Sequence, residues 1–215
     1  MNFNVIAIDG PAASGKSTVA SQLAKRLGYT YVNSGEMYRA ITWKICLSGA
    51  PVDNAESVAA VLDESHIRIG AENGVSYIRI DGFDPTPYLR DEQINRNVSP
   101  VSSIPAVREF LLGRLRAFAE ESNVVMEGRD IGSTVFPDTP YKFYIDASPE
   151  VRRQRRSAQG QSDEIASRDK ADSGRRSAPL IIADDAYVID SSHLTIDGVV
   201  GEIVGRLKLK GLAIS

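Results

Sequence analysis

Residues 10–18 read GPAASGKST and match the phosphate-binding pattern G-x-x-x-x-G-K-[ST]. Residues 3–9, just before them, form a short, apolar, β-branched run, as in a strand that is buried on both faces of a sheet. From Lys16 to Leu27, apolar residues recur at the spacing of one helix face. The sequence therefore predicts a strand, a glycine loop and a helix, in the order that the pattern requires.

The rest of the chain repeats this alternation of strand and helix. Further core strands are expected at residues 29–32, 124–127, 142–146 and 186–190, and further helices at 37–47, 107–118, 149–156 and 195–209. Ser34 is the expected N-cap of the second helix. Because such alternation is typical of parallel sheets, we predict an α/β fold of the P-loop NTPase type, with a parallel five-stranded sheet flanked by helices.

Residues 50–104 have a different pattern. Two alternating runs, residues 66–69 and 75–80, are joined by Ala-Glu-Asn-Gly and predict an antiparallel hairpin. We interpret residues 50–104 as an insertion and residues 152–177 as a polar, Arg-rich lid, both within a single domain that spans residues 1–215.

Composition limits the classes of function. The 215 residues are 42% hydrophobic and carry a net charge of -3, which is too balanced for binding nucleic acid or a membrane through global charge. Cys46 is the single cysteine, so it has no partner for an internal disulfide. Without a signal peptide or an apolar run near 18 residues, we expect a cytoplasmic monomer.

The loop at residues 10–18 predicts a binding site for a nucleoside triphosphate. Glycines let backbone N–H groups converge on phosphate oxygens, and the following helix N-terminus favours negative charge. In this chemistry Lys16 reaches the transferred phosphate and the Ser17 hydroxyl coordinates Mg²⁺. The candidate ATP-binding residues are Gly10, Pro11, Ala12, Ala13, Ser14, Gly15, Lys16, Ser17 and Thr18.

Arginine usage points to a second phosphate-bearing ligand. Of the 25 basic residues 18 are Arg, and residues 151–176 carry a local surplus of four positive charges. The planar guanidinium binds phosphate through two parallel hydrogen bonds, although Arg-rich helices are also often only solvated faces. The D-x-x-G element of GTPase-type switches is absent from the chain.

Three acids at the ends of predicted strands compete for a metal role. They are Asp9, Glu127 and Asp146, and Asp146 is also placed to start the following helix. We favour Glu127, acting on Mg²⁺ through water, because it lies next to Arg129 and Asp130 at the expected cleft.

Over nearly its whole length the chain resembles bacterial cytidylate kinases. The matching segments include IDGPAASGKST at 8–18, NSGEMYRA at 33–40, VSPVSSIPAVRE at 98–109, EGRDIGSTVFPD at 127–138, DASPEVRRQRR at 146–156 and RDKADSGR at 168–175. This resemblance implies an ATP-dependent nucleoside monophosphate kinase. The CMP-binding residues that it implies are Ser34, Tyr38, Arg39, Ser99, Arg108, Arg129, Asp130, Arg168, Asp172 and Arg175. The implied catalytic residues are Lys16, Arg129, Arg168 and Arg175. Residues 157–167 are shorter than the usual lid helix, which leaves the mechanics of the lid open.

Several activities stay open at this stage. The leading hypothesis is phosphoryl transfer from ATP to CMP or dCMP. UMP or AMP could be the acceptor instead, or the alcohol of a small metabolite, which would need a carboxylate base. A P-loop regulatory or binding protein with slow hydrolysis is the alternative from another class.

Overall fold

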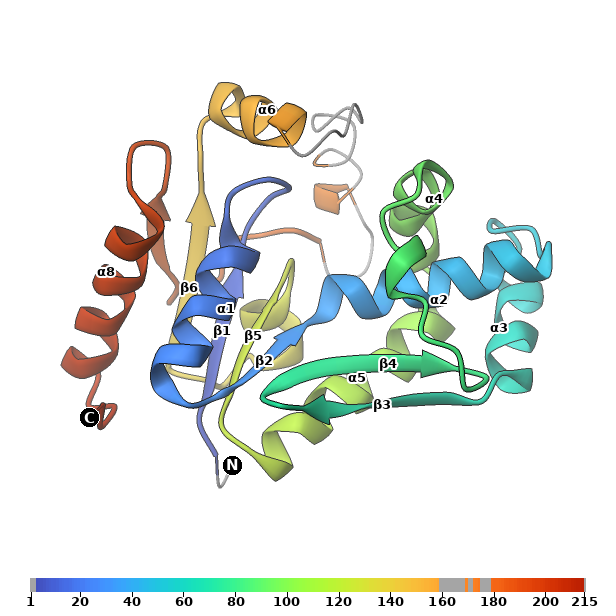
Figure 1. Cartoon of the computed structure of the whole chain (residues 1–215), viewed down its shortest axis with the longest axis horizontal. Helices are drawn as coiled ribbons and strands as arrows, with labels where there is room; N and C mark the ends of the chain where they lie inside the picture. The colour runs from blue at the N-terminus through green and yellow to red at the C-terminus, as the bar shows by residue number, and fades with distance from the viewer. Residues whose placement is uncertain (1–2, 159–168, 170–171, 175–178, 215) are drawn as a thin grey trace.

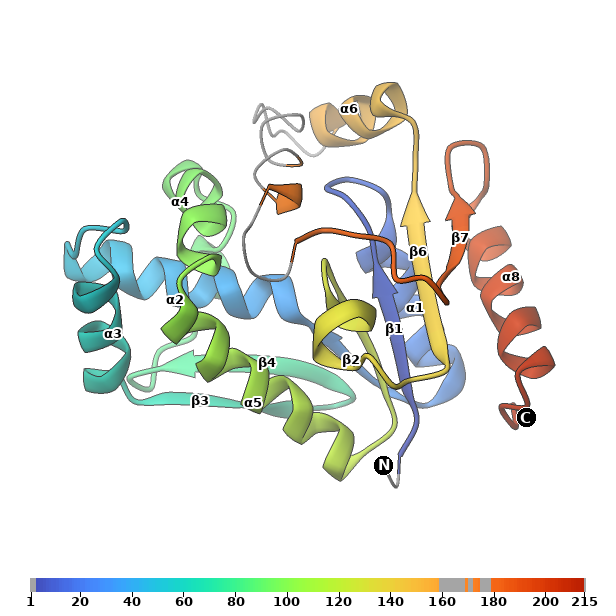
Figure 2. The same cartoon turned by 180° about the vertical axis from the view of Figure 1, so that it is seen from behind.

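The computed structural model describes residues 3–158, 169, 172–174 and 179–214. They form one seven-stranded sheet of order β3-β4-β2-β5-β1-β6-β7, covered by helices on both faces (Figures 1 and 2). The strands are β1 Val5–Asp9, β2 Thr30–Asn33, β3 Ile67–Glu72, β4 Val75–Ile80, β5 Val124–Gly128, β6 Tyr141–Asp146 and β7 Tyr187–Asp190. The predicted α/β class is confirmed, and the five expected strands pair in parallel as β2-β5-β1-β6-β7.

Helices cover both faces of the sheet, and alternate side chains of β1 pack against opposite sets of helices. Ile6 and Ile8 face a cluster that contains α1 and α8, whereas Val5 and Ala7 face one that contains α2 and α5. The helices are α1 Lys16–Leu27, α2 Ser34–Ser48, α3 Ala55–Glu64, α4 Glu92–Ser102, α5 Pro105–Glu121, α6 Pro149–Ala158 and α8 Ile196–Leu209, with short turns η1 Thr86–Tyr88 and η2 Ile131–Val135. Burial on both faces explains why β1 is apolar until its last residue.

The number of strands corrects the prediction. The expected hairpin forms, with Asn73 and Gly74 at φ 52° and 75° as a tight two-residue turn requires. It does not stand apart from the sheet, because β4 pairs in parallel with β2 at Tyr31 and Val75. Tyr31 N–H donates to the Gly74 carbonyl at 2.8 Å, which extends the sheet from five strands to seven.

The start of α2 also differs from the prediction. Asn33, rather than Ser34, is the N-cap, since its side chain accepts from the backbone N–H of Glu36 at 3.1 Å. The Ser34 hydroxyl donates instead to the backbone carbonyl of Glu127 at 2.8 Å. This bond ties the start of α2 to the end of β5.

The bounds of the insertion at 50–104 and of the lid at 152–177 stay predictions. Residues 50–104 hold α3, the hairpin, η1 and α4, and their buried side chains share a core cluster with α2 and α5. Most of the predicted lid, including Arg168 and Arg175, lies outside the described residues. Over the ranges that the structure covers, no helix is both long and apolar enough to cross a membrane.

Candidate active site

A cleft of about 370 Å³ lies at the carboxyl ends of β1, β2 and β5. Open parallel sheets bind ligands at this edge. The predicted site residues that line it are Ala12, Ala13, Gly15, Lys16, Ser17, Thr18, Ser34, Tyr38, Arg39, Glu127, Arg129, Asp130 and Asp172. The structure thus brings residues predicted to bind ATP and residues predicted to bind CMP to one cavity.

The backbone of the loop at residues 10–18 has the curvature that phosphate binding needs. Ala13 and Gly15 have φ of 59° and 92°, and α1 begins at Lys16. Gly10 directly follows β1, and a Cβ atom there would lie 2.1 Å from the Ile145 carbonyl oxygen. Only glycine therefore fits at residue 10, where the loop approaches β6.

Lys16 lies within this loop. Its Nζ donates to the Pro11 carbonyl at 2.9 Å, and the residue is only 7% exposed. The bond holds a cation at the mouth of the loop, where it also lines the cleft. Gly10, Pro11 and Ser14 do not line the cleft themselves.

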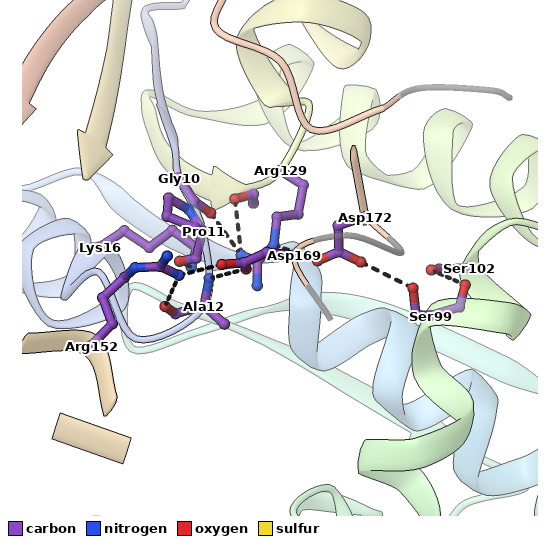
Figure 3. Close-up of polar contacts among 11 residues, drawn as sticks. Gly10, Pro11, Ala12, Lys16, Ser99, Ser102, Arg129, Arg152, Asp169 and Asp172 are labelled. Carbon is purple, nitrogen blue, oxygen red and sulfur yellow. Dashed lines mark hydrogen bonds and ion pairs between the residues drawn. The ribbon is translucent and has the colours of Figure 1, made fainter. Parts of the chain in front are cut away.

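Two arginines of α6, Arg152 (Figure 3) and Arg155, support the loop from outside the cleft. Arg152 donates to the Ala12 carbonyl at 3.3 Å and pairs with Asp169, whose carboxylate accepts from the Ala12 N–H at 3.3 Å. Arg155 donates to the Ser14 carbonyl at 3.1 Å. These arginines hold backbone carbonyls of the loop, a role that sequence reasoning missed.

Arg129, which is predicted to bind CMP, connects the cleft to the glycine loop (Figure 3). Its Nη1 donates to the Gly10 carbonyl at 2.9 Å, and its Nε pairs with Asp172 at 2.9 Å. The other carboxylate oxygen of Asp172 accepts from the Ser99 hydroxyl at 3.0 Å. These contacts link three residues that are predicted to bind CMP, namely Arg129, Asp172 and Ser99. Of the three, Ser99 does not line the cleft itself.

Arg108 does not line the cleft either, and it forms a buried ion pair with Asp130. It donates to the Ser102 carbonyl at 3.4 Å, and its guanidinium lies 5.8 Å from the centre of the Tyr38 ring. In a buried ion pair each charge compensates the other, and removing one partner leaves an uncompensated charge. The Asp130 carboxylate is therefore held beside Arg108, at the wall of the cleft.

Of the three strand-end acids, only Glu127 lines the cleft. It is 3% exposed, and the Tyr31 hydroxyl donates to its Oε1 at 3.3 Å. Asp146 accepts from the backbone N–H of Ala147 at 2.8 Å, next to the start of α6. Asp9 accepts two backbone N–H groups of η2, those of Ile131 at 2.8 Å and Gly132 at 2.7 Å.

A second carboxylate, that of Glu36, lines the cleft and was missed. Burial, and then the charge of Glu127, raise the pKa of Glu36. Burial and both glutamates raise the pKa of Tyr31 as well, which keeps its hydroxyl a hydrogen-bond donor. Glu36 lies inside the matched segment NSGEMYRA at 33–40, so the sequence could have indicated that its side chain lies at the cleft.

The buried Asp9 carboxyl should make the stability of the folded chain depend on pH. Removal from water raises the pKa of its carboxyl to about 7, although the N–H groups of Gly132 and Ile131 act in the opposite direction. The folded state then holds this proton more tightly than the unfolded chain does. The contribution of Asp9 to the free energy of unfolding should therefore fall by roughly 4 kcal/mol as the pH rises from about 4 to about 7.

We expect Asp9→Asn to flatten this pH dependence. The measurement is urea unfolding of both proteins across that pH range, compared by slope because the variant also loses a backbone contact. Parallel slopes for variant and wild type would show that Asp9 does not titrate in this window.

The side chains of the cleft fit a magnesium ion that is bound together with a nucleotide. Among the described ranges, no group of three or more His, Cys, Asp or Glu side chains could hold a metal. Mg²⁺ does not need such a group, because it keeps several waters and binds through one or two protein oxygens together with nucleotide phosphates. The Ser17 hydroxyl and the buried Glu127 carboxylate on the walls of one cleft fit that mode of binding.

Comparison with known proteins adds an independent result. The sequence model of the family described as cytidylate kinase matches residues 6–209. The cytidylate kinase of Caldanaerobacter subterraneus subsp. tengcongensis is 43% identical, with 94% of each chain covered. That of Pseudomonas savastanoi pv. phaseolicola is 41% identical, with 97% of each covered. Among solved structures, TT1252 from Thermus thermophilus covers 99% of this chain and 100% of its own at 17% identity, but its TM-score of 0.49 is too low to add to the assignment. The family match and the two relatives show that this chain belongs to the cytidylate kinase family.

Proposed function

We propose that this chain transfers the γ-phosphoryl group of ATP to CMP or dCMP, giving ADP and CDP or dCDP. The observation that supports it most is a single cleft that is lined both by Lys16 and the glycine loop and by Arg39 and Arg129. Two anionic nucleotides could be held there end to end, with the transferred group between them.

The chemistry places few demands on a general base. The second phosphate pKa of a nucleoside monophosphate is about 6, so the attacking oxygen is already ionised at neutral pH. Neither His66 nor His193 lines the cleft. The work of the chain is to bring two anions into line and to offset their repulsion, which cationic side chains and backbone N–H groups can do.

In this proposal Ser17 would hold Mg²⁺ directly and Glu127 would hold it through water. When bound, the metal supplies positive charge at the phosphates of ATP. Arg168 and Arg175 would add to the acceptor side. We further propose that the enzyme works as a cytoplasmic monomer without nucleic acid, in keeping with its net charge of -3.

Release of ADP in the presence of CMP, dCMP, UMP and AMP tests the proposal. Turnover with CMP or dCMP well above that with UMP and AMP is the expected result. Activity confined to UMP or AMP, or absent with all four, would reject it. An alcohol kinase would need a different acceptor, and a regulatory protein would hydrolyse ATP slowly at a rate that CMP does not change.

Arg108→Met tests the base-binding end of the cleft. We expect it to reduce discrimination between CMP and UMP, because the resemblance places Arg108 at the cytosine and because its pair with Asp130 is buried. The measurement is kcat/KM for both acceptors, with thermal melting to detect loss of folding from the unpaired Asp130. An equal loss with CMP and UMP would assign Arg108 to the phosphate instead.

A further inference from the structure

An amide side chain on α4 joins two arginine-bearing segments at the acceptor side of the cleft. Asn95 lies near the start of α4, which packs beside α2 (Figures 1 and 2). Its Oδ1 accepts from Nη1 of Arg39 at 2.8 Å, and its Nδ2 donates to the backbone carbonyl of Arg90 at 2.9 Å. Arg39 and Arg90 both line the cleft, whereas Asn95 does not.

A second acceptor completes the support of Arg39. The same Nη1 donates to the Leu89 carbonyl at 2.7 Å. Leu89 is 3% exposed and belongs to the core cluster of α2 and α5, so its carbonyl is a fixed point. Because a guanidinium is planar, two acceptors on one terminal nitrogen set the orientation of the whole group.

Both of these acceptors on Arg39 Nη1 are uncharged. Arg108 and Arg129 pair with the carboxylates of Asp130 and Asp172. The hydrogen bonds from Arg39 Nη1 end on an amide oxygen and a carbonyl oxygen, both neutral. The Glu36 carboxyl already lies within electrostatic range of Arg39, so a carboxylate at residue 95 would add a second negative charge there.

We propose that Asn95 is a positioning residue: it orients Arg39 toward the acceptor phosphate and, being uncharged, preserves the attraction between that cation and the phosphate. The inference rests on the proposed function, in which Arg39 binds the phosphate of the nucleoside monophosphate. Asparagine suits the position because one short side chain accepts from Arg39 and donates to the Arg90 carbonyl. Aspartate has the same shape and accepts equally well, but it cannot donate when ionised and it carries charge.

Steady-state kinetics of Asn95→Ala and Asn95→Asp in the full chain test this role. Asn95→Ala should raise KM for CMP about tenfold, the effect of one hydrogen bond to a charged group, with kcat and KM for ATP changed less than about twofold. Asn95→Asp should raise KM for CMP at least as much. A purely structural role predicts the reverse order, because the isosteric Asp disturbs packing less than Ala does.

Asn97→Ala is the matched control. Asn97 is on the same helix. Its Nδ2 donates to the Gln93 carbonyl at 2.9 Å and lies 3.8 Å from Cys46 Sγ, and in the part of the chain that the structure describes it has no hydrogen bond to Arg39 or Arg90. This variant should keep wild-type KM values for both substrates. Thermal melting of all variants separates a kinetic effect from loss of folded protein, and Asn95→Asp carries the test should the Ala variant not fold.

Arg39→Met separates the two levels of the proposal. If it raises KM for CMP while both Asn95 variants match wild type, the role of Asn95 is overturned and the proposed function stands. If Arg39→Met itself leaves KM for CMP unchanged, the phosphate role of Arg39 is wrong and the inference is overturned with it. Equal rises in KM for CMP and ATP in the Asn95 variants would also overturn it, since they indicate distortion of the whole cleft.

Discussion

Lys16→Met is expected to lower kcat for phosphoryl transfer at least ~10³-fold, the lower end of what an arginine finger contributes. Lys16 begins α1 at the mouth of the glycine loop and lies almost out of contact with solvent. A cation in such a setting acts on the charge that develops on the transferred group and needs little reorganisation as it does so. KM for CMP should change much less, because in the proposed function CMP is bound by Arg39 and Arg129 rather than by Lys16.

Lys25→Met is the matched control for this variant. Lys25 lies in the last turn of the same helix and is exposed, so its replacement removes one positive charge at the far end of α1. Steady-state turnover of wild type and both variants, at saturating ATP and CMP, measures the effect on kcat. Near-normal turnover in Lys16→Met would refute the role assigned to Lys16.

Arg129→Met is expected to lower kcat/KM for CMP by about 10²- to 10³-fold, the range seen when one charge-stabilising donor is removed from an active site. The side chain links the Gly10 carbonyl of the glycine loop to Asp172, which lines the cleft. In the proposed function its loss would remove a cation from between two anionic substrates, and it would also break the ion pair with the buried Asp172. Both effects weaken the alignment of attacking and transferred phosphates.

Arg153→Met controls for the loss of an arginine as such. Arg153 is exposed on α6 and is not part of the cleft wall. Its replacement should leave kcat/KM for CMP within about twofold of wild type. A comparable loss in both variants would attribute the effect to overall charge, and no loss in Arg129→Met would remove Arg129 from the site.

The elements that determine the fold were predictable because their signals are local. A strand buried on both faces is continuously apolar, as in residues 5–8, and a glycine loop before a helix has a fixed spacing. Parallel pairing then brings the carboxyl ends of β1 and β5 to one edge, with Asp9 opposite Gly128. The location of the cleft therefore follows from the order of the elements.

The remaining contacts have no periodic signal in the sequence. Arg152 and Arg155 bind backbone carbonyls about 140 residues away, and Arg39 binds the carbonyl of Leu89. Any residue offers such a carbonyl, so nothing in the sequence identifies the partner. The parallel pairing of β4 with β2 was missed for a similar reason, because it is short and depends on how the hairpin packs against the sheet.

The most direct test is calorimetric titration of CMP into the chain, alone and then saturated with a non-hydrolysable ATP analogue. Clamping of two nucleotides end to end predicts that one CMP binds per chain in both conditions and that Arg129→Met weakens it. Uptake of the ATP analogue with no measurable affinity for any pyrimidine nucleotide would contradict the proposed function.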